Sequence, residues 1–169
     1  AAEAKVLSES ISKVLYPSDE IERGRELRLK QQYFFVSATL QDIISQYLVD
    51  HHSFDGFSDW AAIQLNDTHP SIAIPELMRL FIDEYGLAWD ESWSICEKTF
   101  AYTNHTVLPE ALETWPVPLL SGLLPRHMEI IYEINRRFLD NLEREYPDEP
   151  GLLAGLSIIQ EGDVKKVRM

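Results

Sequence analysis

Residues 61–79 read AAIQLNDTHPSIAIPELMR, and their order decides the fold that we expect. The apolar run 61–65 has the length of a buried strand, and it ends abruptly in the polar segment 66–70. A helix then starts near Ile74, where Pro75 suits the first helical turn. The stretch therefore predicts an α/β fold with polar side chains at the carboxyl end of a strand.

The same arrangement occurs a second time later in the chain. The strand-like run 100–103 ends in Asn-His-Thr at 104–106, and a Pro-Glu pair at 109–110 starts another helical turn. In open α/β sheets, ligands bind beyond the carboxyl ends of the strands, next to helix N-termini. Carboxylates and imidazoles there hydrogen-bond to sugar hydroxyls, and aromatic rings pack on the faces of a sugar ring. The two loops together form the candidate binding site.

Other interpretations of these polar residues stay open at this stage. Asp67, Thr68 and Asn104 stand where helix caps and Asx-turns are expected, so capping alone could explain any one of them. A metal hydrolase built on Asp67, His69 and His105 is a further alternative. The adjacent histidines at 51–52 are either solvated or metal-binding.

Composition and charge limit the class of protein. The chain has 169 residues, 45% of them hydrophobic, with 28 acidic side chains against 15 Lys and Arg and a formal net charge of -13. Because such a surface repels phosphate backbones and anionic lipids, we expect neither a nucleic acid nor a membrane partner. The single cysteine, Cys96, excludes an internal disulfide and is expected in the core. Without a secretory signal we expect a cytoplasmic protein, with a plastid as the alternative for a plant relative.

The rest of the chain is predicted to be mostly helical. Apolar residues recur at helical spacing in 1–15, 25–49, the stretch from Trp89, and 125–146. Asp90 is the expected N-cap of the third of these helices. A polar loop is expected over 18–24 and two short strands over 157–169. Because these strands are too few for a complete sheet, we expect the 169 residues to be a single partial α/β domain cut from a longer protein.

Five blocks of the sequence resemble the α-glucan phosphorylases, the family of the glycogen, starch and maltodextrin phosphorylases. In family order they are YPSD at 16–19, LRLKQQYF at 27–34, AIQLNDTHPSIAIPELMR at 62–79, TFAYTNHTVLPEALE at 99–113 and LLPRH at 123–127. The resemblance extends from about residue 10 to the last residue. It implies that the chain is an internal piece, the later part of the Rossmann-like N-terminal lobe, of a two-lobed enzyme of the GT-B type. Such an enzyme transfers a glucosyl unit from an α-1,4-glucan to inorganic phosphate and releases glucose 1-phosphate.

The resemblance also implies roles for individual residues. The positions that match the sugar-binding wall of the cleft are Asp67, His69, Tyr102, His105 and Glu113. The segment 18–24 matches a mobile gate over the site, and the gate residues are Asp19, Glu20 and Arg28. A carboxylate in the gate would repel an incoming phosphate dianion, so its movement would couple opening to phosphate binding. No residue of the chain is implied as a nucleophile.

The cofactor and the partners also follow from the resemblance. It implies pyridoxal phosphate on a lysine of the C-terminal lobe, outside this chain, so no residue here is expected to bind it. The whole enzyme is expected to be a homodimer, with 1–15 as the end of a helix near the dimer interface, and the isolated 169 residues are expected to be inactive. A non-catalytic glucan-binding or interaction module derived from such an enzyme remains the alternative.

Overall fold

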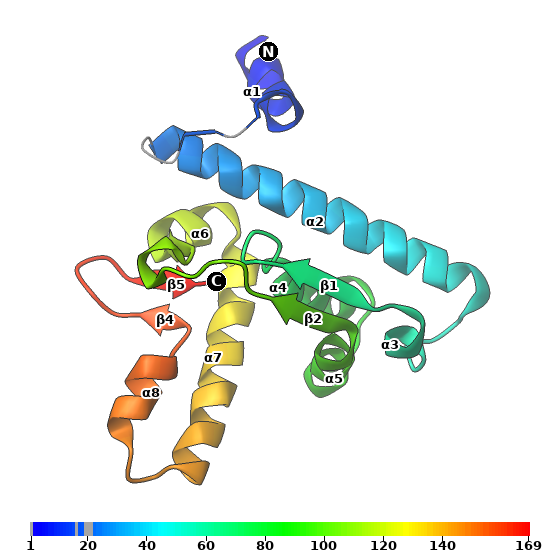
Figure 1. The fold of residues 1–169 in the computed structure, drawn as a ribbon. Helices are drawn as coiled ribbons and strands as arrows, with labels where there is room; N and C mark the ends of the chain where they lie inside the picture. The colour runs from blue at the N-terminus through cyan, green and yellow to red at the C-terminus, as the bar shows by residue number, and fades with distance from the viewer. Residues whose placement is uncertain (1, 16, 19–21) are drawn as a thin grey trace. The chain divides into compact units, whose positions relative to one another are not determined.

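The computed structural model describes residues 2–15, 17–18 and 22–169. The chain divides into two compact units, Ala1–Ser53 and Phe54–Met169, and we describe each by itself. The described residues form a mostly helical α/β structure with two small sheets (Figure 1), as the sequence predicted. Within the described ranges, no helix combines the length and the apolar character that a membrane crossing requires.

The first unit contains two helices, α1 (Ala2–Lys13) and α2 (Glu22–Asp50). The side-chain amide of Gln31, on α2, donates hydrogen bonds to the carbonyls of Ile11 at 3.1 Å and Val14 at 2.7 Å. The last carbonyls of a helix have no partner within the helix itself. Gln31 therefore satisfies the end of α1 and ties it to α2.

The start of α2 differs from the sequence prediction. The loop was predicted over 18–24 and the helix from Arg25, whereas the helix already begins at Glu22. A carboxylate in the first turn is stabilised by the positive end of the helix dipole, which favours the earlier start. The gate residues Asp19 and Glu20 lie outside the described residues.

His51 closes the C-terminal end of α2. Its Nδ1 lies 2.9 Å from the carbonyl oxygen of Tyr47, and its ring stacks on the Tyr47 ring with centroids 4.1 Å apart. A histidine that donates to a carbonyl of the last turn satisfies an acceptor that the helix leaves free. His51 thus has a structural role that the sequence did not predict, while His52 is exposed.

The second unit is built on two parallel strands, β1 (Ile63–Asn66) and β2 (Phe100–Thr103). The strand β2 lies where the sequence predicted it, and β1 begins two residues later than the predicted run 61–65 and includes Asn66. The register pairs Asn66 with Thr103, so the two strands end at the same edge. Parallel strands need a long crossover, and helices supply it here. The crossover elements are α4 (Ala73–Arg79), the π-helical turn η1 (Leu80–Glu84) and α5 (Trp89–Thr99).

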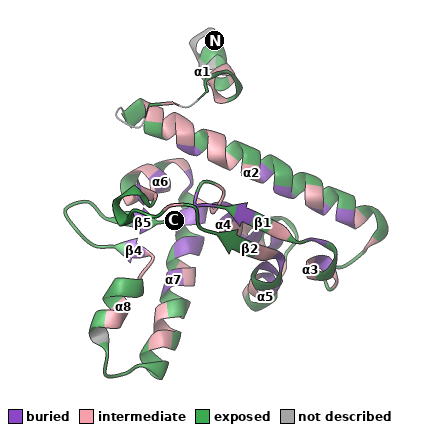
Figure 2. Ribbon diagram, viewed as in Figure 1, coloured by how far each residue is buried: buried purple, intermediate pink, exposed green. Residues whose placement is uncertain are grey.

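The crossover helices bury an apolar core beside β1. Its fully or almost fully buried side chains include Leu65, Ile72, Leu77, Met78 and Phe81. Phe81 meets Phe54 and Phe57 edge to face, with ring centroids 4.9 and 5.5 Å apart. Phe57 belongs to the short helix α3 (Phe57–Trp60), which precedes β1. Figure 2 shows this burial in α4, while Leu65 is the buried residue of β1 and β2 is mostly exposed.

A second, antiparallel sheet follows in the chain, with strand order β3-β5-β4. The structure confirms the two short strands predicted in 157–169, which are β4 and β5, and the helix predicted over 125–146, which is α7. The sequence did not predict β3, α6 and α8, because these elements are too short to show a readable periodicity. The bounds are β3 (Thr114–Pro116), α6 (Val117–Leu123), α7 (Pro125–Glu145), α8 (Pro150–Leu156), β4 (Ile159–Gln160) and β5 (Lys166–Arg168).

Asp90 is not the N-cap of α5, and that prediction was wrong. The helix begins at Trp89 with extended Ala88 at the cap position, so Asp90 lies in the first turn. Its carboxylate accepts a hydrogen bond of 2.6 Å from Nη1 of Arg137, on α7. The same guanidinium lies 4.9 Å above the ring of Trp89. The tertiary pairing with α7 therefore gives Asp90 a partner that no sequence neighbour indicates.

A buried ionic network joins α4 to α7. The side chain of Glu76 is fully buried, and its Oε2 accepts a hydrogen bond of 2.9 Å from Nε of Arg79 and lies 2.5 Å from Nε2 of His127. Arg126, the neighbour of His127, donates two hydrogen bonds of 2.9 Å to Asp83. Because a buried carboxylate is costly unless it is paired, this network fixes the start of α7 against the crossover.

We predict that Glu76→Ala lowers the free energy of unfolding by about 3–5 kcal/mol, because it removes the carboxylate that pairs with the buried imidazole of His127 and with Arg79. Urea unfolding followed by tryptophan fluorescence measures the change. Glu129→Ala is the matched control. It removes an exposed partner of Arg126 and should cost less than about 1 kcal/mol. Equal effects of the two substitutions would show that the network does not hold α7 in place.

Candidate functional site

The loops that follow β1 and β2 meet at the shared edge of the parallel sheet. The backbone N–H of Asp67 donates a hydrogen bond of 2.8 Å to the carbonyl of Thr103. This bond lies directly beyond the last register pair, so it extends the ladder by one residue into the loops. The polar residues after the two strands are therefore neighbours in space, as the sequence predicted from the strand ends.

Asp67 has an unusual backbone conformation. Its φ is 63°, which makes it the residue other than glycine with a positive φ in the described part of the chain. The left-handed region is disfavoured for residues with a Cβ, although aspartate and asparagine tolerate it better than most. The residue is also only 8% exposed, so it is buried at the turn. A conformation of this kind persists only where the surroundings hold it.

Two hydrogen bonds to the carboxylate hold Asp67 in this position. Its Oδ1 accepts the backbone N–H of Thr68, and its Oδ2 accepts the hydroxyl of Thr106, each at 2.8 Å. In the second loop, Oδ1 of Asn104 accepts the N–H of Thr106 at 2.8 Å, which forms an Asx-turn. The carboxylate of Asp67 therefore joins the loop after β1 to the loop after β2.

The electrostatics of the site centre on the same carboxylate. The hydroxyl of Thr106, and after it the N–H of Thr68 and the nearby His69 and His105, hold the pKa of Asp67 below its ordinary value, against the opposing effect of burial. Burial and the charge of Asp67 raise the pKa of Tyr102. Asp67 is thus an anion at neutral pH, and its charge interacts with the side chains at 69, 102 and 105.

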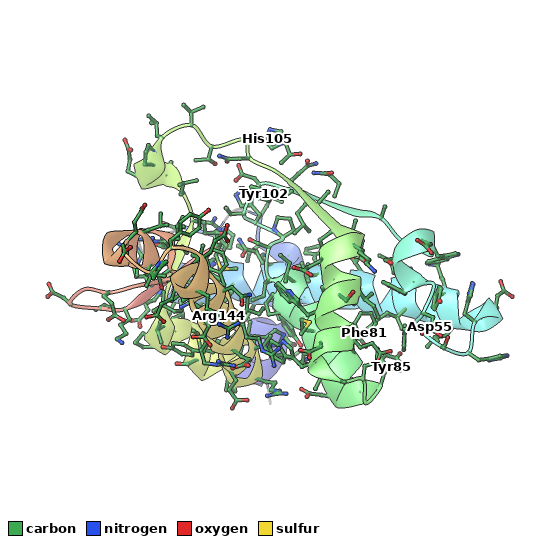
Figure 3. The ribbon with its side chains drawn as sticks, turned by 90° about the horizontal axis from the view of Figure 1, so that it is seen from below. Asp55, Phe81, Tyr85, Tyr102, His105 and Arg144 are labelled. Carbon is green, nitrogen blue, oxygen red and sulfur yellow. The ribbon has the colours of Figure 1, made fainter. Side chains whose placement is uncertain are left out.

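The residues around Asp67 present chemically varied groups to the surface. His69 and His105 are exposed, and Tyr102 is 50% exposed. Figure 3 shows Tyr102 and His105 at one edge of the second unit, where the loop after β2 leaves the strand. Imidazoles and a phenol can donate and accept hydrogen bonds, and a tyrosine ring can pack on an apolar face. This set suits a ligand with many hydroxyl groups.

Glu113 and Arg28 lie on other elements. Glu113 is half-buried and directly precedes β3, and its carbonyl accepts a hydrogen bond of 3.1 Å from the N–H of Met169, at the end of β5. This backbone hydrogen bond joins Glu113 to the second sheet, and the convergence of its side chain with Asp67 stays a prediction. Arg28 is half-buried on α2, in the first unit.

No group of three or more His, Cys, Asp or Glu side chains that could hold a metal ion occurs within 2–15, 17–18 and 22–169. The hydrolase alternative built on Asp67, His69 and His105 therefore lacks a metal-ligand cluster in the described structure. Cys96 is buried, as predicted, and burial raises the pKa of its thiol. A buried thiol with a raised pKa is a poor nucleophile.

An apolar cavity of about 380 Å³ lies elsewhere in the second unit. Its lining comes from α4, α5, α7 and the C-terminal strands and includes Ile74, Trp93, Ile131, Ile134, Ile158 and Val167. Such a lining offers few partners for the hydroxyls of a sugar. The polar edge around Asp67 is the better candidate for a sugar site.

The sequence did not indicate that Thr106 joins the two loops. It did show that the form Asn-x-Thr follows both strands, at 66–68 and at 104–106. A threonine hydroxyl commonly serves its own loop, so nothing local indicates that this one reaches the first loop. The 39-residue separation between Thr106 and Asp67 is bridged only once the strands are paired.

Comparison with known proteins agrees with this architecture. A family model described as carbohydrate phosphorylase matches residues 1–169. The chain belongs to the carbohydrate phosphorylase family. It is 56% identical over 169 residues to the glycogen phosphorylase of Synechocystis sp., which covers 100% of this chain and 20% of that protein.

Eukaryotic members of the family are similar to the same degree. The chain is 57% identical to glycogen phosphorylase 2 of Dictyostelium discoideum over 100% of its own length and 17% of that protein. It is 54% identical to the liver form of glycogen phosphorylase of Ovis aries over 96% of its own length and 20% of that protein. The resemblance inferred from the five sequence blocks is confirmed. The chain spans no more than 20% of the length of these curated relatives.

We predict that the difference in the free energy of unfolding between the unchanged chain and Asp67→Asn shrinks as the pH falls. The pKa of Asp67 is lower in the folded chain than the value of about 3.9 expected in the unfolded chain. The stabilising contribution of the carboxylate is therefore complete above that pH and is lost as the pH falls through the lower folded value. Urea unfolding of both chains at steps from pH 6 to about pH 3 tests this. A difference that stays constant or grows toward low pH would contradict it.

Proposed function

We propose that these 169 residues belong to an α-glucan phosphorylase of the glycogen type, which transfers a glucosyl unit from an α-1,4-glucan to inorganic phosphate and releases glucose 1-phosphate. The family membership and the glycogen phosphorylase relatives support this proposal. The observation that carries the role of this piece is the junction at Asp67, which gathers the ends of two parallel strands beside exposed imidazole and phenol groups. The piece forms the sugar-binding wall of the cleft.

The fold supports a place in the N-terminal lobe of a GT-B enzyme. Two parallel strands joined by a helical crossover are the repeating unit of a Rossmann-like sheet. A sheet of two strands is too small for such a lobe, so the further strands would come from the rest of the protein. The ligand would then bind beyond the carboxyl ends of β1 and β2, where Asp67 and His105 lie.

The wall would act on charge and on orientation. Breaking a glycosidic bond builds positive charge on the glucosyl ring. An ionised carboxylate in a closed cleft would stabilise that charge strongly, because little water is present to screen the attraction. Asp67 is the anion held in place for this purpose. His69 and His105 would bind ring hydroxyls, and Tyr102 would pack beside the ring. Glu113 would join the wall from the segment before β3.

The lysines of this chain lack the setting of a lysine that would hold the cofactor implied by the family. All six lysines, Lys5, Lys13, Lys30, Lys98, Lys165 and Lys166, are exposed. A lysine that forms a Schiff base is typically desolvated, so none of these has the required setting. Pyridoxal phosphate would therefore be bound by the rest of the protein, where its phosphate group would supply acid–base chemistry.

The remaining assignments rest on the family resemblance. The segment 18–24, with Asp19 and Glu20, would gate the site ahead of Arg28. Helix α1 would lie near the interface of a homodimer, and the protein would work in the cytoplasm on glucan, phosphate and glucose 1-phosphate, without nucleic acid or membrane partners.

The deciding experiment uses the full-length protein with glycogen or starch and inorganic phosphate. We expect release of glucose 1-phosphate that depends on phosphate and on bound pyridoxal phosphate. Binding of glucan without release would favour the alternative, a non-catalytic glucan-binding module. Release of free glucose without phosphate would contradict the proposal. The isolated 169 residues should release neither product.

We predict that Asp67→Asn in the full-length protein lowers kcat by roughly 100-fold, because it removes the charge while it keeps the shape of the side chain. Steady-state rates of phosphorolysis measure this. Asp59→Asn, the same change at an exposed position of α3, is the control and should leave kcat unchanged. A kcat of Asp67→Asn within about threefold of the unchanged enzyme would remove Asp67 from the catalytic wall.

A further inference from the structure

The hydroxyl of Thr106 is the side-chain link between the two loops of the site. Its Oγ1 donates to Oδ2 of Asp67 at 2.8 Å across 39 residues of sequence. Thr106 is half-buried, and its own backbone is held by the Asx-turn from Asn104. Hydrogen bonds therefore hold both the backbone and the hydroxyl of Thr106, so the hydroxyl does not rotate freely.

The bond from Thr106 determines how the carboxylate can meet a ligand. A carboxylate has two lone-pair directions on each oxygen. One direction on Oδ1 accepts the N–H of Thr68, and one on Oδ2 accepts the hydroxyl of Thr106. With these two donors, each oxygen keeps one acceptor direction that a hydroxyl group of a ligand would use. Because donors fix both oxygens, the plane of the carboxylate is set before a ligand arrives.

Asp67 needs such support because its backbone lies in the left-handed region. That region is not the intrinsic preference of aspartate, so the loop after β1 alone does not dictate it. The loop after β2 contributes the carbonyl of Thr103, which accepts the N–H of Asp67, and the hydroxyl of Thr106. The second loop thus holds Asp67 at both its backbone and its side chain.

We infer that Thr106 is a positioning residue of the site, whose hydroxyl orients the carboxylate of Asp67 toward the sugar and couples the two strand-end loops. The inference rests on the proposed function, in which Asp67 faces the glucosyl group. It assigns no contact between Thr106 and the ligand. The action of Thr106 on the reaction passes through Asp67, and this makes it distinguishable by experiment.

The test uses Thr106→Val and Thr106→Ser in the full-length enzyme. Valine keeps the shape of threonine and removes the hydroxyl, while serine keeps the hydroxyl. We expect Thr106→Val to lower kcat/KM for phosphorolysis at least tenfold, since a hydrogen bond to a charged group is lost. We expect Thr106→Ser to remain within about threefold of the unchanged enzyme.

Thr99→Val is the matched control. Thr99 is buried at the end of α5, and its hydroxyl has no hydrogen-bond partner among the described residues. The same chemical change there should leave kcat/KM unchanged. A fall in kcat/KM for Thr99→Val as large as that for Thr106→Val would reveal a general packing effect and would overturn the assignment.

A double-mutant cycle separates positioning from a merely structural role. If Thr106 acts through Asp67, Thr106→Val should change kcat/KM less than about twofold when Asp67→Asn is already present. The inference would be refuted if the fold-reductions in kcat/KM of the two single substitutions multiply in the double mutant, or if Thr106→Val alone has no effect on kcat/KM.

Failure of the proposed function would be visible separately. An unchanged full-length protein without phosphate-dependent turnover would end the phosphorylase proposal. The same cycle measured on the free energy of urea unfolding would still decide whether the two side chains are coupled. Additive effects on unfolding would overturn the link between Thr106 and Asp67.

Discussion

The hydrogen bonds around Asp67 are the constraint on which the candidate site depends. Parallel pairing brings the ends of β1 and β2 to one edge, and the bond from Asp67 N–H to the carbonyl of Thr103 continues that pairing into the loops. The left-handed turn at Asp67 then directs its carboxylate to the second loop, where Thr106 meets it. The position of His69 and His105 near one anion follows from this local geometry.

The rest of the second unit keeps the strand ends in place. Phe81 packs against other aromatic rings in the core and stabilises the crossover. The buried carboxylate of Glu76 stabilises it further through its contacts with Arg79 and His127. Glu76, Arg79 and His127 belong to two of the sequence blocks that carry the family resemblance, 62–79 and 123–127. The blocks therefore combine two kinds of residue, those that present polar groups at the strand ends and those that fix the helices behind them.

Much of this could be predicted from the sequence, for physical reasons. The strands and the polar loops after them were predicted because a short apolar run that ends in Asn, Asp and Thr has few other structures to adopt. That Asp67, His69 and His105 lie together followed from the rule for parallel strand ends. The long helix α7 was predicted because its apolar stripe extends over several turns.

The features that the sequence did not predict correctly share a common cause, because each depends on a partner that is fixed by the folded structure. Asp90 was predicted as a cap, but its partner is Arg137 on α7. His51 was expected to be solvated or to bind metal, but it closes α2 against Tyr47. Thr106 was overlooked because its partner lies 39 residues away. Sequence patterns report local preferences well, and they report pairwise contacts between distant segments only through a family resemblance.

A crystal structure of the full-length protein with a bound malto-oligosaccharide tests most directly whether the loops after β1 and β2 bind the sugar. We predict that a glucose ring lies against the loops after β1 and β2, with the carboxylate of Asp67 facing the ring and His105 within hydrogen-bonding distance of it. A sugar bound in the cleft with Asp67 and His105 turned to unrelated surfaces would show that these two strand ends do not form a saccharide wall.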